Sequence, residues 1–199
     1  MSEQDLVHPR AKETRQRILE AALQVFSTKG YHAARMDDIV EAAEASKGAI
    51  YFHFPSKERI FLALIDEFAD LLESQLERAL ASEPSGIRRV DAALRVCIET
   101  FGRYRQLAKV VLVHAVGVGQ AFEQKRLEVN QRFVTIIKRE LDRAVAEGDI
   151  PPQDTEIAAF VWMGALYEIV IRWIYTGQPD PERSLPALRS LLLRSVGVP

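Results

Sequence analysis

Apolar residues recur three and four positions apart along almost the whole of this 199-residue chain, and no stretch alternates apolar and polar residues convincingly. The spacing restricts the fold to helices, because a half-buried strand needs an apolar residue at every second position. Glycine, proline and capping residues divide the pattern into segments. We therefore predict an all-α fold of about nine helices, over residues 11–29, 36–43, 47–53, 56–81, 87–116 with a break near 102–105, 120–147, 154–175 and about 181–196.

Composition excludes several function classes. The formal net charge is −2, so overall charge does not indicate a nucleic-acid partner, although a basic arm stands at Arg10, Lys12, Arg15 and Arg17. With four histidines and one cysteine, and without a glycine-rich phosphate loop or a nucleophile elbow, we expect no catalytic residue, no metal and no cofactor.

The same composition indicates where the protein works. The single cysteine, Cys97, has apolar neighbours and is expected to be a buried, inert thiol in a reducing compartment. The first residues lack an apolar signal core, and the apolar stretch 157–175 contains Glu168 and Arg172, which argues against a membrane span. We expect a cytoplasmic protein without a membrane partner.

The most informative segment is 34–57, where two short helices are joined by a tight turn. On the second of these helices Ile50 and Phe54 are four residues apart and are expected to point to the core. Its other faces carry Lys47, Tyr51 and Phe52 among small residues. A cation, a phenol and an aromatic ring of this kind suit phosphate hydrogen bonds and thymine-methyl contacts in a major groove.

Residues 11–60 resemble the DNA-binding domain of the tetracycline-repressor (TetR) family. The resemblance is carried by TRQRILEAA at 14–22, Phe26 with KGY at 29–31, DIV at 38–40 and SKGAIYFHFPSK at 46–57. It implies a homodimeric bacterial regulator that binds double-stranded operator DNA. Its helix-turn-helix domain would comprise 11–71, with the motif at 35–54, and a helical effector-binding and dimerisation domain would comprise 72–199.

The resemblance also implies roles for individual positions. Ser46, Lys47 and Gly48 open the recognition helix, Ala49 and Phe52 touch base edges or methyl groups, Tyr51 and His53 bind phosphates, and Lys57 anchors to the DNA backbone. The implied DNA contacts are thus Arg35, Met36, Ser46, Lys47, Gly48, Ala49, Tyr51, Phe52, His53 and Lys57.

Two positions depart from the family pattern. Arg35 and Met36 stand where a threonine or serine is usual, so a charge-assisted phosphate contact from Arg35 would replace a hydroxyl contact. Glu44 stands in the turn where glycine is common, and a left-handed conformation there would cost about 1 kcal/mol.

The second half of the chain provides candidates for dimerisation and effector binding. The segment 157–175 is apolar nearly all round, and we expect residues 154–196 to form the dimer interface, with Gly164 and Leu188 in contact. Candidate effector contacts are Phe101, Tyr104, His114, Phe122, Phe133, Trp162, Tyr167, Glu168, Arg172 and Trp173. For each aromatic residue, and for His114, plain core packing is the alternative. Glu168 and Arg172, four residues apart, are otherwise an ion pair at the interface rim.

A weaker resemblance, from EGDI at 147–150 through Phe160, Gly164 and Glu168 to Trp173, points to the fatty-acid-responsive branch, whose effectors are long-chain acyl-CoA thioesters. A bulky apolar or aromatic compound, as in multidrug-responsive relatives, is the competing effector. We predict a repressor released from a palindromic operator by a small apolar effector. The alternatives are a helical adaptor without DNA binding and a small helical enzyme.

Overall fold

The computed structural model describes residues 3–84, 86–113 and 119–198, which form nine α-helices and no strand. This confirms the predicted all-α class. The helices are α1 (Glu3–Ala33), α2 (Met36–Ala42), α3 (Lys47–His53), α4 (Lys57–Ser82), α5 (Gly86–Arg103), α6 (Arg105–Val113), α7 (Gln120–Glu147), α8 (Thr155–Thr176) and α9 (Pro181–Ser195).

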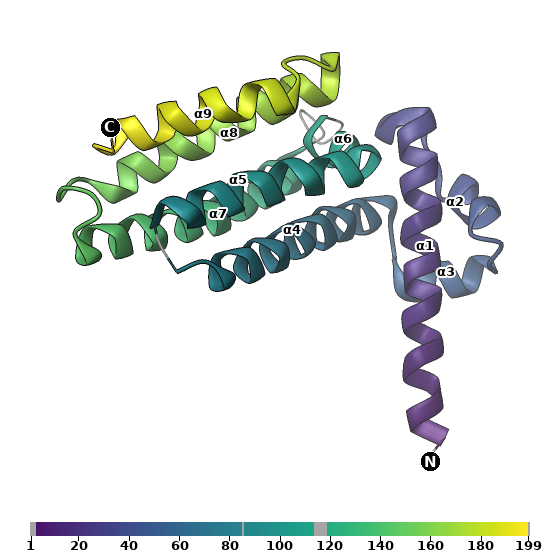
Figure 1. Ribbon diagram of the computed structural model, residues 1–199. Coiled ribbons are helices and arrows are strands. Elements are labelled where there is room, and N and C mark those ends of the chain that lie inside the picture. The colour runs from purple at the N-terminus through teal and green to yellow at the C-terminus, as the bar shows by residue number, and fades with distance from the viewer. Residues whose placement is uncertain (1–2, 85, 114–118, 199) are drawn as a thin grey trace.

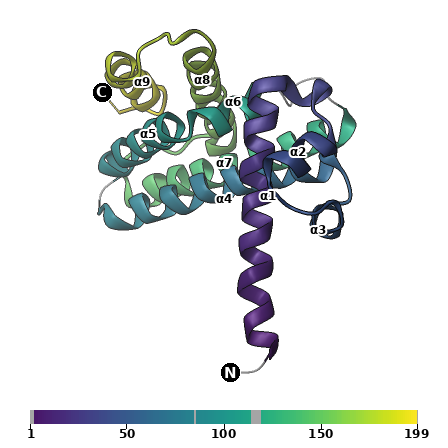
Figure 2. The same ribbon diagram turned by 90° about the vertical axis from the view of Figure 1, so that its right-hand side faces the viewer.

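The helices form two groups (Figure 1). Helix α1 crosses the long helices steeply, and the short α2 and α3 pack beside it. Helices α4, α5, α7, α8 and α9 run roughly side by side, with α8 and α9 forming a layer on the side away from α4 (Figure 2). Helix α4 leads directly from α3 into the long-helix group, so one rigid element belongs to both.

Local signals set most helix boundaries. Ser46, Ser56 and Asp154 each accept a hydrogen bond from the backbone N–H three residues on, at 3.2, 3.3 and 3.0 Å, as predicted for caps of α3, α4 and α8. Gly148 ends α7 in the left-handed conformation with φ of 80°. The predicted break between α5 and α6 is confirmed at Tyr104.

Two boundaries differ from expectation. Helix α1 begins at Glu3 rather than near residue 11, and it continues past Gly30 to Ala33 with a kink, since Gly30 has φ of 75°. The second predicted break, around Gly117 and Val118, lies outside the described residues.

A continuous apolar stripe on α4 holds the two groups of helices together. Its buried residues are Ile60, Phe61, Leu64, Ile65, Phe68, Ala69, Leu72, Leu76 and Leu80. At the junction, Phe122 from the first turn of α7 packs edge-on against Tyr31 of α1 and Phe61 of α4, with ring centroids 5.2 and 5.3 Å apart. The core therefore runs without interruption from the short helices into the long ones.

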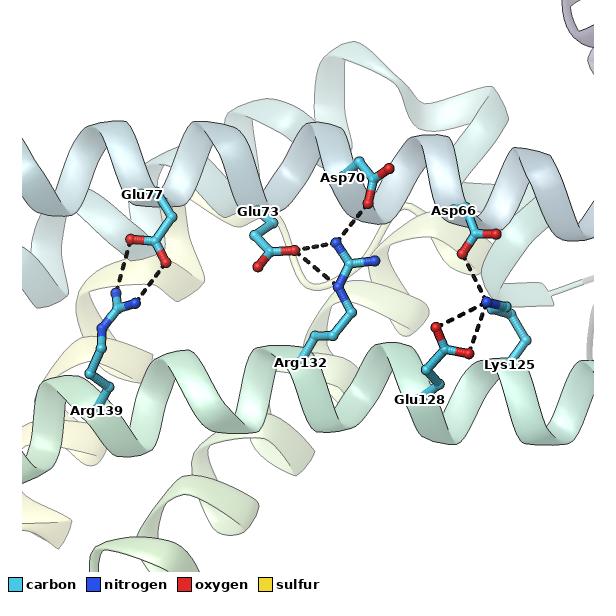
Figure 3. A network of polar contacts seen from close by, with 8 residues as sticks. All are labelled: Asp66, Asp70, Glu73, Glu77, Lys125, Glu128, Arg132 and Arg139. Atoms are coloured by element: carbon cyan, nitrogen blue, oxygen red, sulfur yellow. Dashed lines mark hydrogen bonds and ion pairs between the residues drawn. The ribbon is translucent and has the colours of Figure 1, made fainter.

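On the solvent side of the same contact, acidic residues of α4 face basic residues of α7 (Figure 3). Lys125 lies 3.0 Å from Asp66, Arg132 contacts both Asp70 (2.7 Å) and Glu73, and Arg139 makes two bonds to Glu77 at 2.8 and 3.0 Å. The basic residues are seven apart and so recur on one face of α7. Exposed pairs contribute little individually, but three groups repeated along one face all favour the same register of the two helices.

Helix α8 leaves much of its apolar surface open. By length and composition alone it could cross a membrane, with mean hydropathy 1.6, and only 22% of its most apolar window is buried. Its exposed face is a stripe of Ile157, Phe160, Val161, Gly164, Glu168, Arg172 and Tyr175. On α9, Leu191 is exposed, whereas Leu188 is buried in the core formed with α5 and α8. The expectation that Leu188 faces a second subunit is therefore wrong.

Glu44 adopts φ of 49° in the turn between α2 and α3. We expect Glu44→Gly to raise the free energy of unfolding by about 0.5 kcal/mol, because relief of the left-handed strain exceeds the extra entropy of glycine in the unfolded chain. Glu41→Gly, at an exposed position inside α2, is the control and should lower it by about 0.5–1 kcal/mol. Urea unfolding of both variants measures the difference, and destabilisation by both would show that the turn is unstrained.

Candidate DNA-binding and effector-binding sites

The orientation of α3 is fixed by two anchors. Ile50 is fully buried and Phe54 is 5% exposed, and both pack with Phe26 and Ile39 as predicted. The opposite face is open. Phe52 is 84% exposed and Tyr51 42%, so two aromatic rings stand in solvent on one short helix. Such exposure costs free energy unless another molecule covers the rings.

The start of α3 is shaped for close approach. Ser46, Lys47 and Gly48 are exposed, and a side chain at Gly48 would meet nothing within 4 Å. Contacts within the protein therefore do not require glycine at position 48. A second molecule that packs closely against this helix would require it. Ala49 and His53 are half-buried beside this face.

The charged groups around α3 are partly paired. Lys47 Nζ lies 2.8 Å from Asp37, with both side chains mostly exposed, so the pair can open at little cost. Asp38 accepts hydrogen bonds from Lys29 Nζ and the Arg35 backbone N–H, both at 2.8 Å, which hold the pKa of its carboxyl below the usual value. Arg35 is exposed at the start of α2, and Met36 is half-buried and packs partly against the core, so its expected DNA contact stays a prediction.

Lys57 has a role that the sequence did not indicate. Its Nζ donates to the carbonyl oxygens of Tyr31 and Ala34 at 2.8 Å and of His32 at 3.3 Å, and lies 4.5 Å from the centre of the Tyr31 ring. All three of its donors are thus used within the protein. Lys57 therefore ties the end of α1 to the start of α4, and its expected contact with the DNA backbone stays a prediction.

Part of the basic arm is also structural. The Arg15 guanidinium bonds to Glu67 of α4 at 2.8 Å and lies over the Phe54 ring at 5.3 Å, and Arg17 donates to the Ala43 carbonyl at 3.4 Å. Lys12 is exposed. Sequence reasoning missed these contacts because their partners are 26 or more positions away.

A second candidate site is an apolar cavity enclosed by α4, α5, α6, α7 and α8. The cavity has a volume of about 180 Å³. Of the predicted effector contacts, four lie on its wall: Phe101, Phe133, Trp162 and Tyr167. Cys97 also lies there, and burial raises the pKa of its thiol to about 12, consistent with the expected inert cysteine.

Five of the other six predicted effector contacts do not line this cavity. Phe122 belongs to the junction with Tyr31 and Phe61, and Tyr104 is exposed. Trp173 packs against Arg105. Glu168 and Arg172 form an ion pair on the outward face of α8, which is the alternative interpretation of this pair. His114 lies outside the described residues.

Comparison with known proteins supports the helix-turn-helix interpretation. Residues 18–64 match the model of the bacterial regulatory proteins of the tetR family. The chain is 30% identical to the HTH-type transcriptional regulator YhgD of Bacillus subtilis over 87% of this chain and 91% of YhgD. It is 34% identical to the regulator UidR of Escherichia coli over 74% of each chain.

The chain belongs to the TetR family. This TetR-family protein is therefore a DNA-binding transcriptional regulator and not an enzyme. Its fold is that of solved relatives. The fatty acid degradation regulator FadR of Bacillus halodurans has a TM-score of 0.85 at 21% identity, covering 94% of this chain and 97% of FadR. FadR of Bacillus subtilis, solved with stearoyl-CoA, has 0.81 at 20% identity, covering 92% and 98%. SmeT, solved with triclosan, has 0.80 at 21% identity, covering 92% and 91%.

Replacing Lys57 separates its structural role from DNA binding. We expect Lys57→Met to lower the free energy of unfolding by about 1–2 kcal/mol, because three carbonyl groups lose a charged donor and are only partly reached by water. Lys47→Met, which removes only an exposed ion pair, should change it by less than about 0.5 kcal/mol. Urea unfolding measures both. If Lys57→Met leaves the free energy of unfolding unchanged and reduces the salt dependence of operator binding by about one unit, then Lys57 contacts DNA and does not stabilise the fold.

Proposed function

We propose that this TetR-family regulator is a cytoplasmic homodimeric repressor that an apolar effector releases from a palindromic operator. Residues 11–71 would bind DNA, and residues 72–199 would bind the effector and the second subunit. The observation that carries the proposal is the use of one helix by both sites. Helix α4 packs against α1 of the DNA-binding half and forms a wall of the cavity from Ile65 to Leu80.

The proposed DNA surface is the exposed face of α3 with the start of α2. Phe52 and Ala49 would contact base edges, and Ser46, Lys47, Gly48, Tyr51, His53 and Arg35 would contact or approach the backbone. The 84% exposed Phe52 ring supports this assignment, since thymine methyl groups would cover it. Phosphate contacts would hold the protein on any sequence, and base contacts would select the operator.

The proposed dimer interface is the exposed stripe of α8 with Leu191 of α9. Ile157, Phe160 and Val161 are 59, 47 and 57% exposed, which supports burial against a partner. Gly164 has open space above it and allows a close approach of the helices. A two-fold axis through this stripe would place two α3 helices on successive major grooves, which requires an operator with inverted half-sites.

The effector would act through α4. Ion pairs and the packing of Phe122 on Phe61 join α4 to α7, and Lys57 joins the start of α4 to α1, so a ligand that displaces α4 would also move the DNA-binding half. A ligand lowers operator affinity only by binding the two forms differently, typically by about 1–3 kcal/mol of coupling. An acyl-CoA-like compound is supported by the likeness to the FadR bound to stearoyl-CoA, and a drug-like aromatic compound by the likeness to the SmeT bound to triclosan.

Two variants test the proposal, each of which replaces an exposed apolar side chain with a charged one. Val161→Glu should give a monomer in analytical ultracentrifugation and lose operator binding, because a carboxylate cannot be buried unpaired between two α8 helices. Phe52→Glu should remain a dimer and yet lose operator binding through repulsion from the phosphates. Genomic fragments in a mobility-shift assay supply the operator. A dimeric Val161→Glu protein, or a Phe52→Glu protein with full DNA affinity, would contradict the assigned surfaces.

Reciprocity tests induction. If an effector weakens operator binding by a given factor, then operator DNA must weaken effector binding by the same factor. Titration of long-chain acyl-CoAs and aromatic cations into the free protein and the operator complex measures both. Equal affinity of every compound in both states would rule out induction by these ligands.

A further inference from the structure

The cavity is long and narrow in the direction of α4. Its wall includes Ile65 near one end and Leu80 near the other, which are fifteen residues and hence about 22 Å apart along the helix axis. Apolar side chains make up most of the wall between them, including Phe68, Leu72, Leu94 and Phe133. A slender apolar chain fits such a space better than a broad ring system does.

The one basic side chain among the described residues that line the cavity is Arg89, and it already has hydrogen-bond partners within the protein. Arg89, 3% exposed, donates from Nε to the Glu83 carbonyl at 3.0 Å and from Nη2 to the Pro84 carbonyl at 2.9 Å. Its Nη1 lies 3.5 Å from Glu147. Three of the five N–H donors of Arg89 thus have partners within the protein, and its charge is partly balanced by Glu147.

Only one carboxylate oxygen of Glu140, on α7, has a partner. The side chain is part of the cavity wall, and Oε1 lies 3.1 Å from Arg139 Nε and 3.0 Å from Arg139 Nη2. Its Oε2 is buried and has no hydrogen-bond partner in the described part of the chain. A buried acceptor left without a donor costs about 1–3 kcal/mol, and more when it is charged. Rotation of a carboxylate about its last torsion is soft, so a small turn presents Oε2 to a ligand.

Taking the cavity as the effector site of the proposed function, we propose that the effector is a long-chain amphiphile with a hydrogen-bond donor, best a primary ammonium, that binds Glu140. The ammonium donates to Oε2, and the chain extends along the cavity toward Phe68 and Phe133. A neutral hydroxyl makes a weaker version of the same bond. A carboxylate head at this point brings a second negative charge beside Glu140 and is disfavoured.

Three probes that share one alkyl chain test the head group: dodecylamine, dodecanol and dodecanoate. Each competes with an environment-sensitive apolar dye for the full-length protein below its critical micelle concentration. We expect dodecylamine to bind most tightly and dodecanoate least. Glu140→Gln should weaken dodecylamine on the order of ten-fold or more and dodecanol by less than about three-fold, as loss of a charge-assisted bond requires.

Glu128→Gln is the matched control, because it removes the same charge from an exposed ion pair on the same helix and should leave all three affinities unchanged. The head-group inference is overturned if dodecanoate binds as tightly as dodecylamine, or if Glu140→Gln binds dodecylamine with wild-type affinity. In either case the cavity remains the proposed effector site. Failure of the dye and all three probes to bind the wild-type protein overturns the inference and the proposed effector site together.

Discussion

Helix α4 has to bury nine side chains between Ile60 and Leu80, and no single neighbour covers a stripe of that length. Helix α1 covers its start, and α5, α6 and α7 cover the rest, so the two functional halves share one core. The cavity lies against this same stripe, where packing is incomplete. Because interiors are close-packed, a space of this size on the connecting helix is a place where a ligand can change the energy of the whole arrangement.

The local features of the fold were predictable from the sequence. Helices α3 and α7 have the predicted boundaries, because Ser46, Pro55, Gly148 and the prolines at 151 and 152 act through backbone geometry alone. The inward and outward faces of α3 followed from its period, since Ile50 and Phe54 are four residues apart. The strained turn at Glu44 also followed from a local rule, namely that a position suited to glycine is occupied by another residue.

The remaining features depend on contacts between distant residues. Lys57 was assigned to DNA because it matches the backbone-anchoring lysine of the family, but its partners within the protein are carbonyl groups 23–26 positions away, which no local pattern reveals. Helix α8 is apolar nearly all round, so the spacing of its apolar residues could not show whether Glu168 and Arg172 point to the cavity or outward. The same ambiguity placed Leu188 on the wrong side of α9. The orphaned oxygen of Glu140 is visible only once the surroundings of α7 are known.

The junction of Phe122 with Tyr31 and Phe61 limits how modular this protein is. In a hybrid regulator, the DNA-binding domain of one protein is fused to the effector-binding domain of another. A joint between residues 71 and 72 leaves the Phe122 ring on the effector-binding domain and its two ring partners on the DNA-binding domain, and it divides the ion pairs of Lys125 with Asp66 and of Arg132 with Asp70 in the same way. A hybrid therefore has unmatched side chains at this junction, unless the positions on both sides of it are transferred together.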